Sequence, residues 1–236
     1  MFILADKFVA YMEPGFLIHC PPQIKGAVFD MNLSAGWYRY GNKIFTIDFF
    51  TENEILYQVY WLRYNVRQLK LSDSHQKILN KNKRFNYKII PFQNTQELEA
   101  LHALYFENID FTTISSIQEL MEDVDNSVYN SMLIEIRDEN KLIGAGIFDY
   151  GNKCIAGIKN IFHPGYKKYS LGKYLMLLKY QYCLQQNIEW YYPGYFAPGH
   201  KKFDYKLTID PGATEVCLIE NRKWVSYRDF ILLGSR

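Results

Sequence analysis

The sequence lacks the cysteine and histidine spacings of zinc sites and disulfide frameworks. Its four cysteines, Cys20, Cys154, Cys183 and Cys217, are scattered over 236 residues, and no CxxC pair occurs. Structural zinc sites and disulfide frameworks need such residues at short, recurring spacings, so we expect neither. Cys154 and Cys183 stand in apolar runs, which is typical of small core residues. We therefore expect no metal and no cofactor.

An excess of one charge and a long apolar segment are also lacking. Lys and Arg number 27 against 25 Asp and Glu, so any nucleic acid must be held by a local basic patch. The opening MFILADKF contains Asp6 and lacks the basic and apolar regions of a signal peptide, and no run is long enough to span a membrane. We expect a monomeric, cytoplasmic protein with neither a membrane nor DNA as partner.

Aromatic side chains are abundant, with 20 Tyr and 16 Phe. They predict a core and clefts lined by amphipathic rings. Aromatic and β-branched residues crowd 16–18, 37–50 and 55–69, which predicts a β-rich segment over residues 1–70. A basic helix capped at Ser72 or Asp73 follows. These features predict a smaller N-terminal subdomain over residues 1–84, with a second domain over 85–236.

The second part alternates helices and strands. A helix is expected to begin at Asn94 through a capping box. The other expected elements are strands over 85–92, 131–137, 142–150, 153–162 and 188–196, helices over 116–124 and 171–186, and a hairpin over 214–227. This order is typical of an α/β (α+β) N-acetyltransferase-like domain, a mixed sheet flanked by helices. In that fold the strands on either side of the central helix splay apart, and the acyl donor enters the gap.

The stretch from His163 to Cys183 predicts an anion site. It reads as a strand end, a lysine-rich loop and a helix that begins at Ser170. The first turn of a helix has unpaired N–H groups and partial positive charge, which favour phosphate. Gly172 allows a ligand close to the backbone, and positive charge comes from Lys167, Lys168 and Lys173. The alternative is an ordinary surface loop with solvated lysines.

Several segments, in order, resemble the arginyl-tRNA–protein transferase family, which includes bacterial leucyl transferases acting on acidic N-termini. Ser-Leu-Gly at 170–172, Tyr-Pro-Gly-Tyr at 192–195 and Lys-Phe-Asp-Tyr-Lys at 202–206 resemble its C-terminal motifs. Segments 36–41 and 61–85 resemble its N-terminal half, and Asp149 stands where the family has an aspartate. The family's cysteine pairs are missing from residues 49–60, so the resemblance implies no metal here.

The resemblance implies an aminoacyl-tRNA–protein transferase. It would move leucine or arginine from charged tRNA, its co-substrate, to the N-terminal amine of a protein or peptide, marking it for degradation. The ester is already activated, so the enzyme must hold the tRNA acceptor end, orient the amine, remove a proton and stabilise an oxyanion.

The resemblance also implies roles for particular residues. The catalytic residues would be Asp149, which takes a proton from the incoming amine or orients it, and Tyr195, which faces the cleft. The acceptor end of tRNA would be held by Lys167, Lys168, Ser170, Gly172, Lys173, Lys202, Tyr205 and Lys206. The tRNA body would contact Lys77, Lys81 and Arg84, which share a narrow arc of the basic helix. The acceptor's acidic side chain would meet Trp37 and Arg39, the latter by a paired hydrogen bond to carboxylate.

Structural interpretations of the same residues stay open. Asp149 can simply form a turn, the basic arc can be a solvated helix face, and Trp37 and Arg39 can be the exposed side of a strand. Two other functions also stay open: an acyl-CoA-dependent N-acetyltransferase and a non-catalytic RNA-binding module on the same fold.

Overall fold

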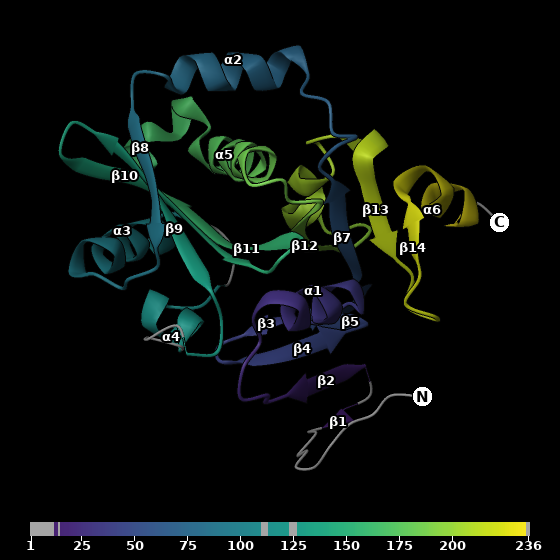
Figure 1. Cartoon of the computed structure of the whole chain (residues 1–236). Helices are drawn as coiled ribbons and strands as arrows, with labels where there is room; N and C mark the ends of the chain where they lie inside the picture. The colour runs from purple at the N-terminus through teal and green to yellow at the C-terminus, as the bar shows by residue number, and fades with distance from the viewer. Residues whose placement is uncertain (1–11, 14, 110–112, 123–126, 235–236) are drawn as a thin grey trace.

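The computed structural model describes residues 12–13, 15–109, 113–122 and 127–234, so the predicted absence of a signal peptide at 1–8 concerns residues outside this set. A central mixed sheet of eight strands runs in the order β14-β13-β7-β12-β11-β10-β9-β8 (Figure 1). Its strands are β7 (Tyr60–Asn65), β8 (Asn86–Pro91), β9 (Ser131–Asp138), β10 (Lys141–Tyr150), β11 (Cys154–Phe162), β12 (Trp190–Phe196), β13 (Thr214–Cys217) and β14 (Trp224–Ser226).

Helices cover both faces of this sheet. On one face α5 (Leu171–Gln185) packs against β10, β11 and β12, with α2 (Asp73–Asn82) outside it. On the other face lie α3 (Gln96–Phe106) and α4 (Ile117–Met121) (Figure 1). Because both faces are covered, β10 is buried from Leu142 to Asp149. Every helix in the described part of the chain is too short or too polar to cross a lipid bilayer.

The N-terminal part is β-rich, as the sequence predicts. A four-stranded sheet has the order β1-β2-β4-β3, with strands at Met12–Glu13, Phe16–His19, Lys43–Ile47 and Tyr38–Tyr40. A hairpin pairs β5 (Phe49–Glu52) with β6 (Ile55–Gln58). The sequence did not predict α1 (Gly26–Ser34), which has no side-chain cap, or α6 (Tyr227–Gly234) near the C-terminus.

The two predicted parts share a core. Strand β7 falls within residues 1–84, yet it pairs with β12 and β13 inside the large sheet. Its Trp61 stacks on Tyr38 of the small sheet, with ring centroids 4.2 Å apart and planes 8° from parallel. The small sheet therefore packs against β7, the neighbour of β12, and its residues reach the same region as those of β12.

Strands β11 and β12 separate after a short parallel pairing. They pair only at Cys154–Ala156 and Trp190–Tyr192. Beyond these residues β11 stays with β10, up to Phe162, while β12 stays with β7. This splay confirms the predicted N-acetyltransferase-like fold and opens a gap between the ends of the two strands.

Most predicted elements of the second part lie where the sequence places them, including the strands over 131–162 and the helix after Ser170. One cap is different. The helix α3 is capped by Thr95, whose Oγ1 accepts from the Leu98 N–H at 3.2 Å, and not by Asn94. The helix predicted over 116–124 ends at Met121, and residues 123–126 lie outside the described set. Cys154 and Cys183 are buried, as expected.

Candidate active site

Two adjoining cavities occupy the splay. The first has a volume of about 220 Å³ and the second about 460 Å³. Both are lined by Ile158, Lys159 and Asn160 of β11 and by Tyr205 and Lys206 of the short 3-10 helix η2 (Lys201–Lys206). These shared residues mark the boundary between the cavities, so a ligand bound to both would pass along them.

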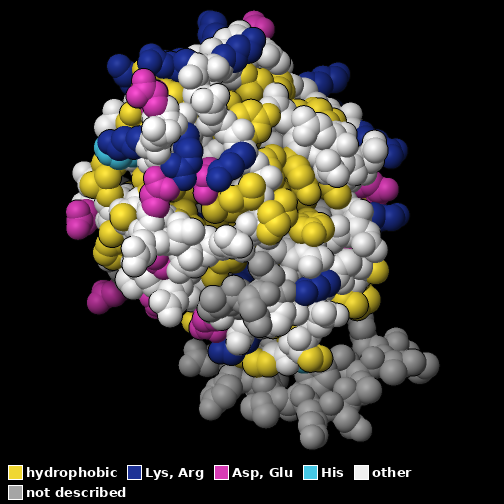
Figure 2. Space-filling model, turned by 60° about the vertical axis from the view of Figure 1, so that its left-hand side comes forward, with side chains coloured by type: hydrophobic (Ala, Val, Ile, Leu, Met, Phe, Trp, Pro, Cys, Tyr) yellow, Lys and Arg dark blue, Asp and Glu magenta, His cyan; other side chains and the backbone are white. Residues whose placement is uncertain are grey.

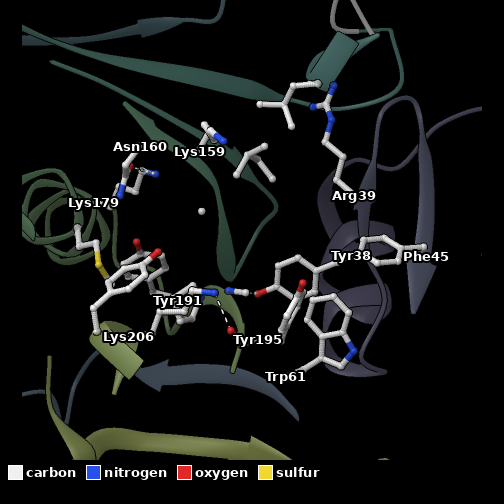
Figure 3. A pocket seen from close by; sticks show the side chains of 17 residues that line it. Tyr38, Arg39, Phe45, Trp61, Lys159, Asn160, Lys179, Tyr191, Tyr195 and Lys206 are labelled. Atoms are coloured by element: carbon white, nitrogen blue, oxygen red, sulfur yellow. Dashed lines mark hydrogen bonds between the residues drawn. The ribbon is translucent and has the colours of Figure 1, made fainter. Parts of the chain in front are cut away.

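Aromatic rings form the walls of the first cavity. Tyr38, Trp61 and Tyr195, from β3, β7 and β12, lie together on one side (Figure 3). Tyr191 and Pro193 also line it, as the alternation of side chains along β12 requires. Burial raises the pKa of Tyr195 to about 12, with a smaller contribution from Glu52, so its phenol stays neutral at physiological pH.

The second cavity begins at the N-terminus of α5. Ser170, Gly172 and Lys173 line it, together with the rings of Tyr105, Phe162 and Phe203 and the side chain of Lys202. Ser170 makes no side-chain cap to this helix of 15 residues. A Cβ at Gly172 would lie 3.3 Å from the Phe162 ring. The first turn of α5 therefore presents backbone N–H groups and lysine charge to a cavity with aromatic walls.

A buried lysine lies under the boundary. Lys179 of α5 is 1% exposed, and its Nζ donates to the Ile147 carbonyl at 2.8 Å and to Asn160 Oδ1 at 2.9 Å. Burial lowers the pKa of Lys179 to about 7. Figure 3 shows Lys179 and Asn160 together, across the cavity from Tyr38 and Tyr195. Lys179 thus fixes the Asn160 side chain, which faces both cavities.

Lys206 is the second buried lysine. It is 7% exposed, and its Nζ donates to the backbone oxygen of Tyr195 at 2.6 Å, the dashed line beside Tyr195 in Figure 3. Gly194 has a φ of +100°, and a Cβ there would lie 3.2 Å from this Nζ. Burial lowers the pKa of Lys206 to about 7, with Lys202 adding to the effect.

Lys159 completes the positive lining. Its Nζ donates to Thr113 Oγ1, and burial lowers its pKa to about 8, helped by Lys202. No Asp or Glu is among the described residues that line either cavity. Within the same described residues, no group of three His, Cys, Asp or Glu side chains is placed to hold a metal ion.

A separate basic surface lies outside the cavities. We call the exposed Lys77, Lys81, Arg84, Lys167 and Lys168 the α2–η1 surface, after α2 and the 3-10 helix η1 (Pro164–Tyr169). Lys81 donates to the Lys168 carbonyl, which joins the two elements. Figure 2 shows Lys and Arg side chains gathered across the top of the molecule, the level of α2 in Figure 1.

Comparison with known sequences decides the family. A family described as "Arginine-tRNA-protein transferase, C terminus" matches residues 52–215, more than half of the chain. The chain belongs to this family. The aspartate/glutamate leucyltransferase of Leptospira interrogans is 24% identical over 89% of this chain and 82% of its own length. That of Saccharophagus degradans is 26% identical over 70% of each chain.

Two further similarities are more limited. The arginyl-tRNA–protein transferase 1 of Dictyostelium discoideum is 29% identical over 44% of this chain and 17% of its own length. The solved structure of FemX aligns with 79% of this chain and 64% of its own, with a TM-score of 0.47 and 8% identity. The predicted family is therefore confirmed by sequence, while the fold follows from the strand order and the splay.

The structure divides the residues that the sequence assigned to this transferase's acceptor-end site. Ser170, Gly172, Lys173 and the η2 residues Lys202, Tyr205 and Lys206 all line the second cavity. Lys167 and Lys168 do not line it, because η1 carries them to the outer surface beside α2. Sequence reasoning missed Lys159, Asn160 and Lys179. Lys179 gave a usable signal, since it shares a helix face with Gly172 and Met176 in a helix that is apolar almost all round.

Asp149 and Arg39 form an internal pair. Arg39 Nη1 lies 3.0 Å from Asp149 Oδ1, and both side chains are 1% exposed. Arg39 also donates to Ser131 Oγ and to the carbonyls of Gly41 and Met121. Arg39, which was predicted to bind the acceptor's acidic side chain, lines the first cavity but already pairs with a carboxylate of this chain. Asp149 lines neither cavity.

The other predicted contact of the peptide acceptor, Trp37, lies away from the cavities. Trp37 packs against the apolar cluster around Tyr38 and Trp61, and it lines neither cavity. The geometry therefore gives Asp149 and Trp37 a structural place outside the cavities. Arg39 lines the first cavity, but its guanidinium is held by internal partners, and none of the three enters the proposed reaction.

We predict that the main effect of Asp149→Asn is a loss of fold stability and not a loss of transfer activity. It leaves the Arg39 charge buried without a carboxylate, which costs about 3 kcal/mol of the free energy of unfolding. Urea unfolding measures this change. Glu215→Gln, which breaks the more exposed pair with Arg63, is the control and should cost about 1 kcal/mol or less. Unchanged stability with lost transfer would instead assign Asp149 to catalysis.

Proposed function

We propose that this aminoacyl-tRNA–protein transferase moves leucine from charged tRNA to the N-terminal amine of proteins that begin with Asp or Glu. The observation that carries the choice of amino acid and acceptor is the positive charge of the residues that line the cleft. Its described lining holds Lys159, Lys173, Lys179, Lys202 and Lys206 and no carboxylate. The leucyltransferase names of the two bacterial relatives support the same choice.

The first cavity suits an apolar donor side chain. Trp61, Tyr195 and Met176 are among its walls, and leucine buries apolar surface against such groups at no electrostatic cost. An arginyl side chain would bring a guanidinium beside Lys179 and Lys206 with no acid in the described lining. An unpaired charge in a desolvated site costs several kcal/mol, so the cavity selects against arginine.

The second cavity suits the 3′-terminal adenosine of tRNA. Its rings, including Tyr105 and Phe203, offer stacking surfaces for a base. Lys173 and Lys202, with the first turn of α5, offer positive charge to the adjoining phosphate. If adenosine occupies the second cavity and leucine the first cavity, the ester that joins them lies at the shared boundary.

The acceptor reaches this boundary from solvent. Its first residue carries an acidic side chain, which the lysine lining attracts through the same positive potential that holds the tRNA phosphates. The α2–η1 surface extends this potential outside the cleft, toward the body of the tRNA, through sequence-blind contacts with the backbone. The acceptor is therefore chosen by charge at the N-terminus, and the tRNA by its acceptor end and shape.

The requirement for charged tRNA also favours the cytoplasm as the place of work. We further propose that the monomer is the active form. Family membership favours aminoacyl transfer over the acyl-CoA-dependent acetyltransferase and the RNA-binding module, the two alternatives that the sequence left open.

We predict that the purified protein transfers leucine, and arginine at least about 100-fold less well, to a peptide that starts with Asp or Glu. The measurement is mass spectrometry of reporter peptides after incubation with leucyl-tRNA or arginyl-tRNA, with peptides starting with Lys as controls. Equal transfer of arginine contradicts the donor assignment. No transfer from any charged tRNA contradicts the proposed function as a whole.

We predict that the α2–η1 surface supplies salt-dependent affinity for tRNA. Replacing Lys167 and Lys168 by alanine should weaken binding and reduce the slope of log Kd against log salt by about 1 for each phosphate that these lysines no longer neutralise. Fluorescence titration of labelled tRNA at several salt concentrations measures the slope. Lys223→Ala, at an exposed lysine between β13 and β14, is the matched control. An unchanged slope in the double variant removes this surface from the tRNA site.

A further inference from the structure

The geometry points to Lys206 as the proton acceptor for the incoming amine, in place of the phosphate contact that its motif suggested. This inference rests on the proposed function, because it needs an aminoacyl ester at the boundary of the two cavities. It assigns a step of the reaction to a residue for which the sequence had only a binding role.

Lys206 lies where the reacting bond must be. It is one of only five described residues that line both cavities, and it comes from η2, on the side of the gap bounded by β12. Its Nζ lies 5.2 Å from the ring centroid of Tyr195 and 4.9 Å from that of Phe203. A group fixed between two rings at this boundary is close to both the donor ester and any amine that approaches it.

The hydrogen bonding of Lys206 suits a neutral amine. Its Nζ donates to the Tyr195 carbonyl at 2.6 Å, and a neutral amine that gives one N–H there keeps a lone pair for a proton. The charged and titratable groups that line the cavities with it are Lys202 and Tyr205 of η2, Lys159 of β11, Lys173 and Lys179 of α5, Tyr191 and Tyr195 of β12, Tyr38 and Arg39 of β3, and Tyr105 of α3. With positive neighbours and no described carboxylate among them, the charged form gains no anionic partner.

Burial and the charge of Lys202 give Lys206 a pKa of about 7, against about 10.4 for a free lysine. An N-terminal ammonium group has a pKa of about 7.7–8.0, so proton transfer to Lys206 is nearly balanced at neutral pH. General bases work best with a pKa near the working pH. Lys206 can therefore accept the proton and release it again within one turnover.

The other two lysines of the boundary are committed elsewhere. Lys179 Nζ donates to the Ile147 carbonyl and to Asn160 Oδ1, so two of its hydrogen-bonding directions are already used. Lys159 donates to Thr113 Oγ1, a residue that lines the second cavity only. Lys206 has its backbone partner on β12 and its remaining side toward the gap.

The proposed step balances as follows. Lys206, as a neutral amine, takes one proton from the acceptor's N-terminal ammonium, and the freed amine attacks the carbonyl carbon of the leucyl ester. The C–N bond forms, the C–O bond to the terminal ribose breaks, and the leaving ribose oxygen takes the second proton of the nitrogen. The products are an amide, a free ribose hydroxyl and protonated Lys206, which loses its proton to water.

The test uses Lys206→Met, which keeps the bulk but not the base, and Lys206→Arg, which keeps a charge but cannot accept a proton at these pH values. Single-turnover transfer of leucine is measured from pH 6 to 9, and tRNA affinity is measured in parallel. Lys201→Met, an exposed lysine of the same 3-10 helix that lines neither cavity, is the matched control.

We expect both Lys206 variants to lose about 100-fold or more of the rate at pH 7 while the arginine variant keeps its tRNA affinity. The wild-type rate should level off above a pKa near 7. The variant rates should keep rising through the acceptor's own pKa, near 8, so that the loss shrinks at pH 9.

A Lys206→Arg rate within about 3-fold of wild type, or a Lys206→Met loss that is the same at every pH and matched by lost tRNA affinity, overturns the inference and restores the phosphate contact. If the methionine variant does not fold, as thermal unfolding would show, the arginine variant alone decides. Failure of the wild-type protein to transfer leucine is a separate outcome, which contradicts the proposed function itself.

Discussion

The site depends on one constraint, the early end of the pairing between β11 and β12. The two strands run in parallel for three residue pairs, Cys154–Ala156 with Trp190–Tyr192, and each then follows its other neighbour. Backbone groups beyond that point face a gap instead of a strand. The helix α5 starts at one edge of this gap and η2 closes the other, so both cavities exist only because the sheet opens there.

A second feature gives the gap its chemistry. Five lysines line it without a carboxylate among the described lining residues, and two of them, Lys179 and Lys206, are almost fully buried. Burying an ammonium group without an acid partner costs free energy. This cost falls when the lysine loses its proton or when it binds an anion. One arrangement can therefore hold phosphate, repel a cationic donor side chain and supply a neutral amine. The carboxylate that the sequence singled out, Asp149, instead neutralises Arg39 in the core.

The sequence predicted local features well, because they depend on local pattern. The strands over 131–162 are joined by short turns, and the helix after Ser170 follows a strand and a polar loop. Long-range pairings were harder. Asp149 and Arg39 are 110 residues apart, and β7 lies beside β12 only through sheet order. Lys167 and Lys168 follow the expected strand, but a 3-10 turn carries them outward. Their distance from the cavity follows from the geometry of the loop, which the number of lysines in the sequence does not predict.

The most direct test of the account is the structure of the protein with a non-hydrolysable leucyl-adenosine, in which an amide replaces the ester. The account predicts the leucyl side chain among Trp61 and Tyr195, the adenine among Tyr105 and Phe203, and the carbonyl carbon at the boundary, within roughly 4 Å of space that an amine beside Lys206 would occupy. Binding on the α2–η1 surface alone, or a carbonyl carbon remote from Lys206, would contradict it.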